Sequence, residues 1–374
     1  MQCDYFSAGR CRSCTLMEVP YARQLADKQA NARAALAEVA ADVRWAEPFA
    51  SSESGYRNKA KWAVGGTAVN PTIGILGRDF QGIDLRRCGI CEPGLLAAFP
   101  LLADAIAAMG LAPYDVARRS GELKYLIVTV SPEDELMVRF VVRSTRQLPA
   151  IRDGLPGLRQ ALPGLAVVSV NLHPEHKAVL EGADEIVLSD RATLPMRIND
   201  LTLHLPPRSF FQTNTAVAAG LYRQAAGWAD EISPGSVLDL YCGVGGFALH
   251  CAPASARSVR GIEVSADAAA GARDSALALP DPARFTFEAA DAGGQPEVDA
   301  DLVIVNPPRR GIGAALAEKL EHGSAGHLIY SSCNVTSLAA DLARMPSLRP
   351  RQARLFDMFP QTAHQEVAVL LERR

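Results

Sequence analysis

Short apolar runs alternate with alanine-rich or amphipathic stretches throughout the second half of the chain. Runs of this length, bounded by turn residues, predict buried strands, and the stretches between them predict helices. Strands are expected at 237–241, 259–263, 285–289, 302–305, 328–331, 353–356 and 367–371, with helices from 247 and after 263. Buried strands that alternate with helices are typical of a parallel sheet covered on both faces. We therefore predict an α/β fold whose C-terminal part is a Rossmann-like, doubly wound, mostly parallel sheet.

The first half of the chain mixes helical and extended patterns in less regular order. An alanine-rich, charged stretch predicts a helix, and glycines before an apolar run predict a hairpin. The helices are expected at 21–43, 95–109 and 148–162, the hairpin through 73–76, and strands at 125–130, 136–142, 167–172, 185–188 and 201–205. Pro206 and Pro207 then mark a boundary. The pattern predicts three consecutive domains, at 1–93, 94–205 and 206–374.

Chemically useful side chains stand where the predicted C-terminal strands end. In parallel sheets, ligands bind at the carboxyl ends of the strands, which meet at one edge. The residues at or just past such ends are Tyr241, Glu263, Asp291, Asn306 and Cys333. We expect them to lie along one edge of the sheet.

A glycine loop follows the first of these strands. Its sequence, Gly243-Val244-Gly245-Gly246, lets the backbone pass close to a ligand. A dinucleotide site has a similar loop, but Ala248 replaces the third glycine of its pattern, and no basic residue stands in the turn for a phosphate. Glu263, at the end of the next strand, can accept hydrogen bonds from ribose hydroxyls. These details favour S-adenosylmethionine, with an NAD-linked reductase as the alternative.

A thiol and a late carboxylate supply a second kind of chemistry. Cys333 follows an apolar strand, and Glu366 comes near the C-terminus with His364 close by. A thiolate that adds to carbon 6 of uracil makes carbon 5 nucleophilic enough to take a methyl group, and a base then removes the carbon-5 proton. Cys333 can be that thiolate and Glu366 that base, with His364 as the rival. Taken singly, Cys333 and His364 are better explained as structural residues, and Glu366 is equally well explained as an ordinary exposed acid.

A stiff, basic loop lies between these elements. It follows the predicted strand at 302–305 and reads Asn306-Pro307-Pro308-Arg309-Arg310-Gly311. Two prolines restrict the backbone, and a side-chain amide can present a donor and an acceptor to a pyrimidine edge or to the cofactor. The arginine side chains can bind phosphate groups. This string is more specific than the glycine loop.

Composition narrows the class of protein. Hydrophobic residues make up 48% and charged residues 21%, as in an ordinary globular protein, and the net charge of −3 excludes a uniformly basic nucleic-acid coat. No apolar run reaches the roughly 18–20 residues that cross a bilayer, and the N-terminus lacks a signal-peptide pattern. We expect a cytoplasmic protein without a membrane partner, whose eight cysteines are reduced.

Five cysteines gather in the first quarter of the chain. Two pairs with a spacing of three, Cys11 with Cys14 and Cys88 with Cys91, read as a four-thiolate zinc ribbon. That interpretation leaves Cys3 unused. The alternative is an iron–sulfur cluster held by Cys3, Cys11, Cys14 and one later cysteine. Spacing alone does not decide between the two metals.

Two basic clusters lie outside the predicted catalytic part. Arg57, Lys59 and Lys61 alternate, so that a strand would place them on one face, and aromatic residues flank them. Aromatic rings beside basic groups are typical of RNA surfaces, where bases stack. The second cluster contains Arg118, Arg119 and Lys124. The alternative for either cluster is a solvated strand face.

These motifs together resemble those of the RNA uracil-5-methyltransferases, and the similarity runs over nearly the whole chain. The strings that carry it lie at 1–3, 9–14, 56–61, 121–125, 209–214, 306–313, 330–334 and 356–360. The resemblance implies S-adenosylmethionine-dependent methylation of carbon 5 of a uridine in 23S rRNA, with uridine 747 as the expected position, through a covalent Cys–uracil intermediate. It implies a C-terminal methyltransferase domain, an N-terminal iron–sulfur segment and a central α/β RNA-binding domain.

The resemblance also implies roles for single residues. Cys333 matches the nucleophile and Glu366 the proton-abstracting base. The positions that match cofactor contacts are Gln212, Tyr241, Glu263 and Asn306, with Asp291 as a further candidate near the adenine. Those that match the ligands of a [4Fe–4S] cluster are Cys3, Cys11, Cys14 and Cys88, which makes Cys91 structural. The residues expected to contact RNA are Arg57, Lys59, Lys61 and Lys124.

The sequence departs from relatives at two of these positions. Asn306 stands where relatives that act on other uridines usually carry Asp, and Tyr241 stands where they often carry Phe. The expected partner is a single-stranded or loop uridine of 23S rRNA, and the expected state is a monomer. An RNA-binding iron–sulfur module with a degenerate catalytic domain is the alternative from another class of protein.

Overall fold

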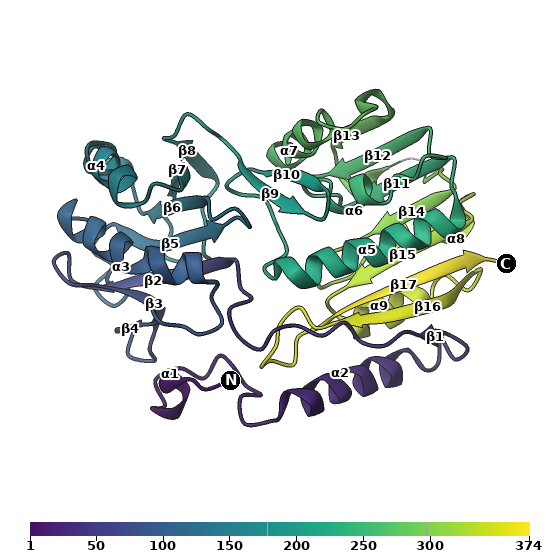
Figure 1. Cartoon of the computed structure of the whole chain (residues 1–374), viewed down its shortest axis with the longest axis horizontal. Helices are drawn as coiled ribbons and strands as arrows, with labels where there is room; N and C mark the ends of the chain where they lie inside the picture. The colour runs from purple at the N-terminus through teal and green to yellow at the C-terminus, as the bar shows by residue number, and fades with distance from the viewer. Residues whose placement is uncertain (178, 296–297) are drawn as a thin grey trace. The chain divides into compact units, whose positions relative to one another are not determined.

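The computed structural model describes residues 1–177, 179–295 and 298–374, and it divides into two compact units (Figure 1). The first unit consists of Met1–Cys14 and Glu53–Met196, and the second of Thr15–Ser52 and Arg197–Arg374. The expected domains at 1–93, 94–205 and 206–374 do not coincide with these units, because residues 15–52 pack with the C-terminal part of the chain. The roles assigned to those three segments stay predictions.

The first unit is built on a sheet with the strand order β4-β3-β2-β5-β6-β7-β8 over the described residues. Among the described strands of this sheet, only β6 and β7 pair in parallel. Helices α3 and α4 pack on one face, where Phe99, Ile106 and Ile151 are fully buried. The elements are α1 (Asp4–Ser7), β2 (Lys59–Gly66), β3 (Pro71–Leu76), β4 (Gly82–Asp84), α3 (Pro93–Ala108), β5 (Leu123–Val130), β6 (Leu136–Val142), η1 (Thr145–Gln147), α4 (Leu148–Ala161), β7 (Leu165–Leu172) and β8 (Asp184–Val187).

The second unit contains a larger sheet, with the order β1-β16-β17-β15-β14-β11-β12-β13 over the described residues. A separate two-stranded sheet, β9 (Leu194–Ile198) with β10 (Leu201–Leu205), lies where the first unit ends. The remaining strands are β1 (Arg44–Trp45), β11 (Ser236–Leu240), β12 (Ser258–Glu263), β13 (Phe285–Ala289), β14 (Leu302–Val305), β15 (His327–Ser332), β16 (Leu348–Phe356) and β17 (Glu366–Arg373). The helices are α2 (Tyr21–Leu36), α5 (Thr215–Ile232), α6 (Gly246–His250), α7 (Ala266–Ala276), η2 (Pro282–Arg284), η3 (Ala292–Gly294), α8 (Gly313–His322) and α9 (Val335–Leu342).

Strands β11 to β15 pair in parallel, so their carboxyl ends share one edge, as expected of a Rossmann-like sheet. Strand β17 differs, because it runs antiparallel to both of its neighbours, β15 and β16. The loop 357–365 that joins β16 to β17 is too short for the crossover that a parallel pair needs. The antiparallel direction brings the start of β17 to the same edge as the end of β15.

Helices cover both faces of this sheet, with α5 and α6 on one face and α8 and α9 on the other (Figure 1). Helix α2 joins the second of these faces, where Ala32 and Leu36 are fully buried against the shared core. It ends at Leu36, earlier than the expected 43, because the chain must become extended to pair β1 with β16. None of the helices in the described parts of the chain has the length and apolar surface that a membrane span requires.

Candidate active site

The thiol and the carboxylate singled out in the sequence meet across neighbouring strands. The register of β15 and β17 ends at the pair Ser332 and Val367, and Cys333 follows just past β15, whereas Glu366 is the first residue of β17. The charge of Glu366 acts on the thiol of Cys333, so the two side chains are neighbours. Cys333 is half-buried, and Glu366 is only 3% exposed. Ser331 pairs with Ala368, and alternate residues of a strand share a face, so Ser331 and Glu366 point to the same side of the sheet. The edge therefore holds a partly accessible thiol beside a buried carboxylate.

Burial gives Glu366 an unusual affinity for protons. It raises the pKa of this carboxyl from its usual 4.5 to about 7, because the charged form has lost its water. Ser331 acts in the opposite direction, since its Oγ donates a hydrogen bond of 2.5 Å to Oε1 and favours the charged form. A carboxyl with a pKa near neutrality suits a general base.

Cys333 experiences opposing influences. Burial is the largest of them and raises the pKa of its thiol, and the charge of Glu366 acts in the same direction. The guanidinium of Arg309 lowers the pKa, through its charge and through a hydrogen bond. Arg309, together with a hydrogen bond from the backbone of Cys333, thus favours the reactive thiolate.

Hydrogen bonds from neighbouring elements hold the loop that carries Arg309. The buried carboxylate of Asp341 accepts hydrogen bonds at Oδ2 from the Ile312 amide (2.9 Å) and the Tyr330 hydroxyl (2.7 Å). Gly311 has a φ of +81°, and any side chain there would collide with the same carboxylate. Asn334 Nδ2 donates to the carbonyl of Arg309 at 2.9 Å. The arginine is therefore fixed relative to the residue that follows Cys333.

The glycine loop after β11 has the geometry of a ligand cradle. Tyr241 adopts a φ of +67°, a conformation that strains a bulky residue and that occurs mostly at functional sites. Gly243 has a φ of +55°, and a side chain added there would meet open space. Glu263 braces the loop by accepting from the amides of Gly243 (3.0 Å) and Ser265 (2.9 Å). Each of its oxygens keeps a second lone pair for a ligand.

The other expected cofactor contacts differ in their accessibility. Asp291 is exposed just after β13, and its charge adds to burial in raising the pKa of Tyr241. Asn306 is half-buried after β14, and within the described residues its amide makes no hydrogen bond. Gln212 is 5% exposed and precedes α5. Asp291, Tyr241 and Asn306 therefore have groups that a ligand at this edge could reach.

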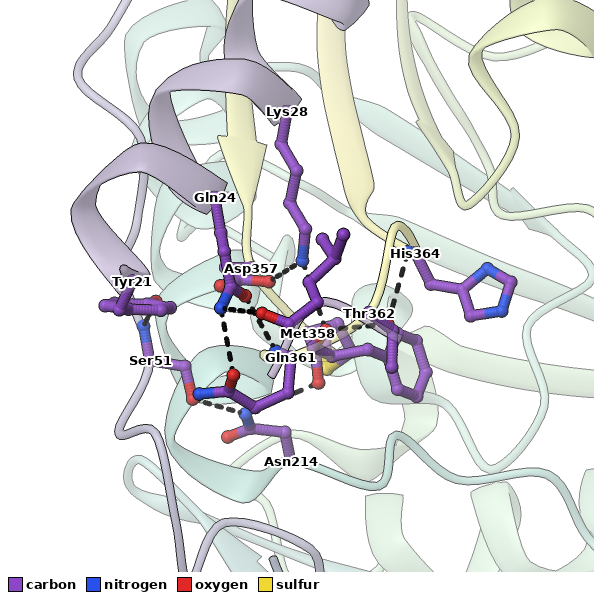
Figure 2. A network of polar contacts seen from close by, with 12 residues as sticks. Tyr21, Gln24, Lys28, Ser51, Asn214, Asp357, Met358, Gln361, Thr362 and His364 are labelled. Carbon is purple, nitrogen blue, oxygen red and sulfur yellow. Dashed lines mark hydrogen bonds and ion pairs between the residues drawn. The ribbon is translucent and has the colours of Figure 1, made fainter. Parts of the chain in front are cut away.

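A network of polar contacts fixes the loop 357–365 that leads into Glu366 (Figure 2). Lys28 of α2 is 3% exposed, and its Nζ lies 2.6 Å from Asp357 Oδ1 and 3.1 Å from the carbonyl of Phe359. Gln24, one helical turn earlier, exchanges hydrogen bonds with Gln361, whose φ is +66°. Helix α2 thus anchors the loop through two buried polar side chains.

His364, the rival base, lies in this loop with a different environment. It is exposed, and its ring extends away from the polar network (Figure 2). Burial, Arg309 and Lys28 all lower the pKa of the imidazole. Glu366, by contrast, is buried, and its charge acts on the thiol of Cys333.

Four of the N-terminal cysteines interact within the first unit. Besides burial, the thiols of Cys88, Cys11 and Cys3 raise the pKa of Cys14 to about 11, so these four sulfurs are neighbours. Cys91 is 1% exposed and packs in the apolar core with Leu95, and its thiol also hydrogen-bonds that of Cys88. No group of three or more His, Cys, Asp or Glu side chains within residues 1–177, 179–295 and 298–374 is close enough to hold a single metal ion.

The expected basic face of β2 is largely neutralised. Lys61 lies 2.7 Å from Glu181, and Arg139, in the same cross-strand row, lies 2.6 Å from Glu185. The expectation of an accessible face was wrong for Lys59, which is 6% exposed and whose pKa burial lowers to about 7. It was also wrong for Lys124, which is 6% exposed and donates to the carbonyl of Glu175.

The side chain of Arg57 is partly exposed to solvent, and its Nε donates to the carbonyl of Lys59 at 2.8 Å. Lys61 is the most exposed of the four residues expected to contact RNA. The loss of accessible positive charge on this face has a physical cause. Glu181, in a loop distant in sequence, and Glu185 of β8 pair with the basic side chains of this face. The alternating pattern of one strand cannot predict such partners.

Sequence reasoning missed Lys28, Gln24 and Asp341, and it gave Ser331 no role. The sequence did contain a signal for the first two, because Gln24, Lys28, Ala32 and Leu36 follow one another at a spacing of four. The structure shows that all four are buried. Residues with this spacing share one face of a helix. Two polar residues that continue an apolar stripe indicate buried polar contacts.

Known proteins resemble this chain over its full length. The family model described as tRNA (Uracil-5-)-methyltransferase matches residues 296–374. The 23S rRNA (uracil(747)-C(5))-methyltransferases RlmC of Halothiobacillus neapolitanus and Serratia proteamaculans are 46% and 45% identical to this chain, over 100% of each chain.

A solved structure agrees in fold. The tRNA (uracil-54, C5)-methyltransferase of Pyrococcus abyssi, in complex with S-adenosyl-L-homocysteine, superimposes with a TM-score of 0.79 at 24% identity, over 96% of this chain and 85% of that chain. That likeness concerns the fold alone. The sequence identity to the RlmC proteins is higher, and it extends over the full length of each chain. This chain therefore belongs to the family of RNA uracil-C5-methyltransferases that contains RlmC.

Proposed function

We propose that this protein transfers a methyl group from S-adenosylmethionine to carbon 5 of uridine 747 in 23S rRNA. The observation that carries the proposal is the position of Cys333 beside the buried Glu366, at the carboxyl edge of a methyltransferase-type sheet. The full-length identity to RlmC proteins supports the choice of RNA and of nucleotide.

In the proposed mechanism, the two residues act in sequence on one covalent adduct. The thiolate of Cys333 forms a bond to carbon 6 of the uracil, and the ring electrons move to carbon 5. Bound S-adenosylmethionine supplies the methyl group as an electrophile. Glu366 then takes the proton from carbon 5, the carbon 5–carbon 6 double bond reforms, and the bond from carbon 6 to sulfur breaks.

The cradle supports this choice of cofactor. The open space beside Gly243 leaves room for a ligand next to the backbone, and the lone pairs of Glu263 suit ribose hydroxyls. Tyr241 and Asp291 would border the adenosine, and Asn306 would offer its unbonded amide. Gln212 is proposed as a further contact, reached from the segment before α5.

We also propose that Cys3, Cys11, Cys14 and Cys88 hold a [4Fe–4S] cluster. Four soft thiols in one neighbourhood are the donor set that such a cluster prefers. A cluster of four irons holds its thiolates further apart than a single ion does, so the sulfurs need not converge on one point. For the RNA, we propose that Arg57 and Lys61 contact phosphate.

Substitution of the two catalytic residues tests the mechanism. Cys333→Ala should abolish methyl transfer to an unmodified 23S rRNA transcript, because no other residue supplies the bond to carbon 6. Glu366→Gln should accumulate a protein–RNA adduct that survives denaturing electrophoresis, because the methylated adduct cannot lose its proton. Both variants should bind S-adenosylmethionine as the wild type does, which serves as the control for folding. Methyl transfer by the Cys333→Ala variant would refute the role of the thiol.

A further inference from the structure

The hydroxyl of Ser331 has a partner that the mechanism does not explain. Ser331 is fully buried near the end of β15, and its Oγ donates to Glu366 Oε1 at 2.5 Å across the β15–β17 pair. A buried serine has many possible acceptors on neighbouring backbones, yet this one contacts the proposed base. Hydrogen bonds from a neutral donor to a charged oxygen are short and strong.

The charge of Glu366 acts on two neighbours in its buried position. They are Tyr222 of α5 and Cys333, and both are ordinarily neutral. Arg309 donates a hydrogen bond to the thiol of Cys333. Among the described residues, Oε2 makes no hydrogen bond, whereas Oε1 is taken by Ser331. The two oxygens of this carboxylate are therefore not equivalent.

We propose, on the basis of the function proposed above, that Ser331 is a positioning residue for the removal of the carbon-5 proton. Its hydroxyl holds Oε1 and stabilises the charged carboxylate, which leaves Oε2 to take the proton. The bond from carbon 5 to hydrogen breaks, its electrons form the carbon 5–carbon 6 double bond, and the sulfur of Cys333 leaves. Ser331 does not touch the substrate in this scheme and acts only through Glu366.

The adjacent residue offers a matched control. Ser332 is also buried, at 2% exposure, but it points to the other face of the strand. Its Oγ exchanges hydrogen bonds of 3.1 Å with the backbone of Asn334 and has no contact with Glu366. Ser331→Ala and Ser332→Ala therefore make the same chemical change in the same strand, and only the first removes the bond to the base.

The test separates proton removal from methyl transfer. An unmodified 23S rRNA transcript carries tritium at carbon 5 of its uridines, and S-adenosylmethionine carries a ¹⁴C methyl group. Single turnovers of full-length protein are followed from pH 5.5 to pH 9, and both labels are counted. S-adenosylmethionine binding by each variant confirms that it is folded.

In Ser331→Ala, we expect methyl transfer to proceed while tritium release slows by roughly 10-fold to 100-fold, the loss that one hydrogen bond to a charged group implies. The adduct should accumulate, and the pH midpoint of tritium release should move upward, because the carboxylate has lost its stabilising donor. Ser331→Thr keeps a hydroxyl and should restore the midpoint. Ser332→Ala should keep the wild-type midpoint.

Two outcomes overturn the inference in distinguishable ways. If Ser331→Ala released tritium with the same rate and the same pH midpoint as Ser332→Ala, the role of Ser331 would be refuted and the proposed function would stand. If the wild type transferred no methyl group and released no tritium, the proposed function would fail, and the role of Ser331 would fail with it.

Discussion

At the scale of single residues, burial determines how the site works. Glu366 has a pKa suited to the proposed role of base at neutral pH, because the protein removes its water and, among the described residues, returns one hydrogen bond, from Ser331. Burial also raises the pKa of the Cys333 thiol, and the charge of Arg309 opposes that rise. The motif at 331–334 predicts Cys333 as the nucleophile, but a motif does not show which hydroxyl faces which carboxylate.

The raised pKa of Glu366 predicts a change of stability with pH. Its folded value of about 7 lies above the usual 4.5 of an unfolded chain, so the folded protein binds the proton more tightly. This stabilisation is fully present below pH 4.5 and is lost as the pH rises through about 7. Wild-type protein should therefore lose free energy of unfolding, on the order of 1–3 kcal/mol, relative to Glu366→Gln between pH 5 and pH 8.

Urea denaturation of both proteins at the two pH values measures this difference. The amide of Glu366→Gln does not titrate, so it serves as the reference for all other groups in the protein. An equal gap between the two proteins at pH 5 and pH 8 would show that the carboxyl is not shifted.

At the scale of elements, helix α2 stabilises a loop far away in the sequence. Its i, i+4 stripe continues from apolar Leu36 and Ala32 to polar Lys28 and Gln24, and the polar end meets the loop 357–365. A helical period predicts which residues share a face, but it does not predict what lies opposite. A lysine is rarely buried unless it is paired, and the ion pair of Lys28 with Asp357 allows its burial.

Loss of this ion pair should be costly. Lys28→Met leaves the carboxylate of Asp357 buried and unpaired, and we expect a loss of about 3–5 kcal/mol in the free energy of unfolding. Arg23→Met on the same helix breaks the exposed pair with Asp27 and should cost less than about 1 kcal/mol. Urea denaturation compares the two variants. Similar losses in both would contradict the view that Lys28 anchors the loop.

At the scale of the whole molecule, the chain crosses between its two units more than once. Residues 15–52 leave the first unit, supply α2 and β1 to the second, and return at Glu53. The N-terminal cysteines and the catalytic edge therefore belong to different compact units, although α2 directly follows the cysteines. Each unit has its own sheet and its own apolar core.

The cysteine assignment can be tested on anaerobically purified full-length protein. Cys14→Ser should lose most of the bound iron and sulfide, together with the visible absorbance, because it removes one of four proposed ligands. Cys91→Ser should keep them, since that thiol packs in the core. Bound zinc that is lost equally in both variants would instead identify the zinc ribbon that the two Cys-x-x-Cys pairs allow.

The sequence by itself determined the order and type of most elements, because apolar periodicity follows directly from burial on one or both faces. The strands at 136–142, 201–205, 285–289 and 302–305 match the observed β6, β10, β13 and β14. Those strand ends also placed Tyr241, Glu263, Asn306 and Cys333 near one edge of a sheet, since parallel strands end together.

Only the tertiary structure decided the antiparallel insertion of β17, which brings Glu366 beside Cys333. It alone decided that Lys59 and Lys124 are buried and that Ser331 contacts Glu366, the proposed base. The reason is physical. Periodicity records what a residue prefers to face, whereas proton affinity and charge pairing depend on partners that are distant in sequence and are brought close only by folding.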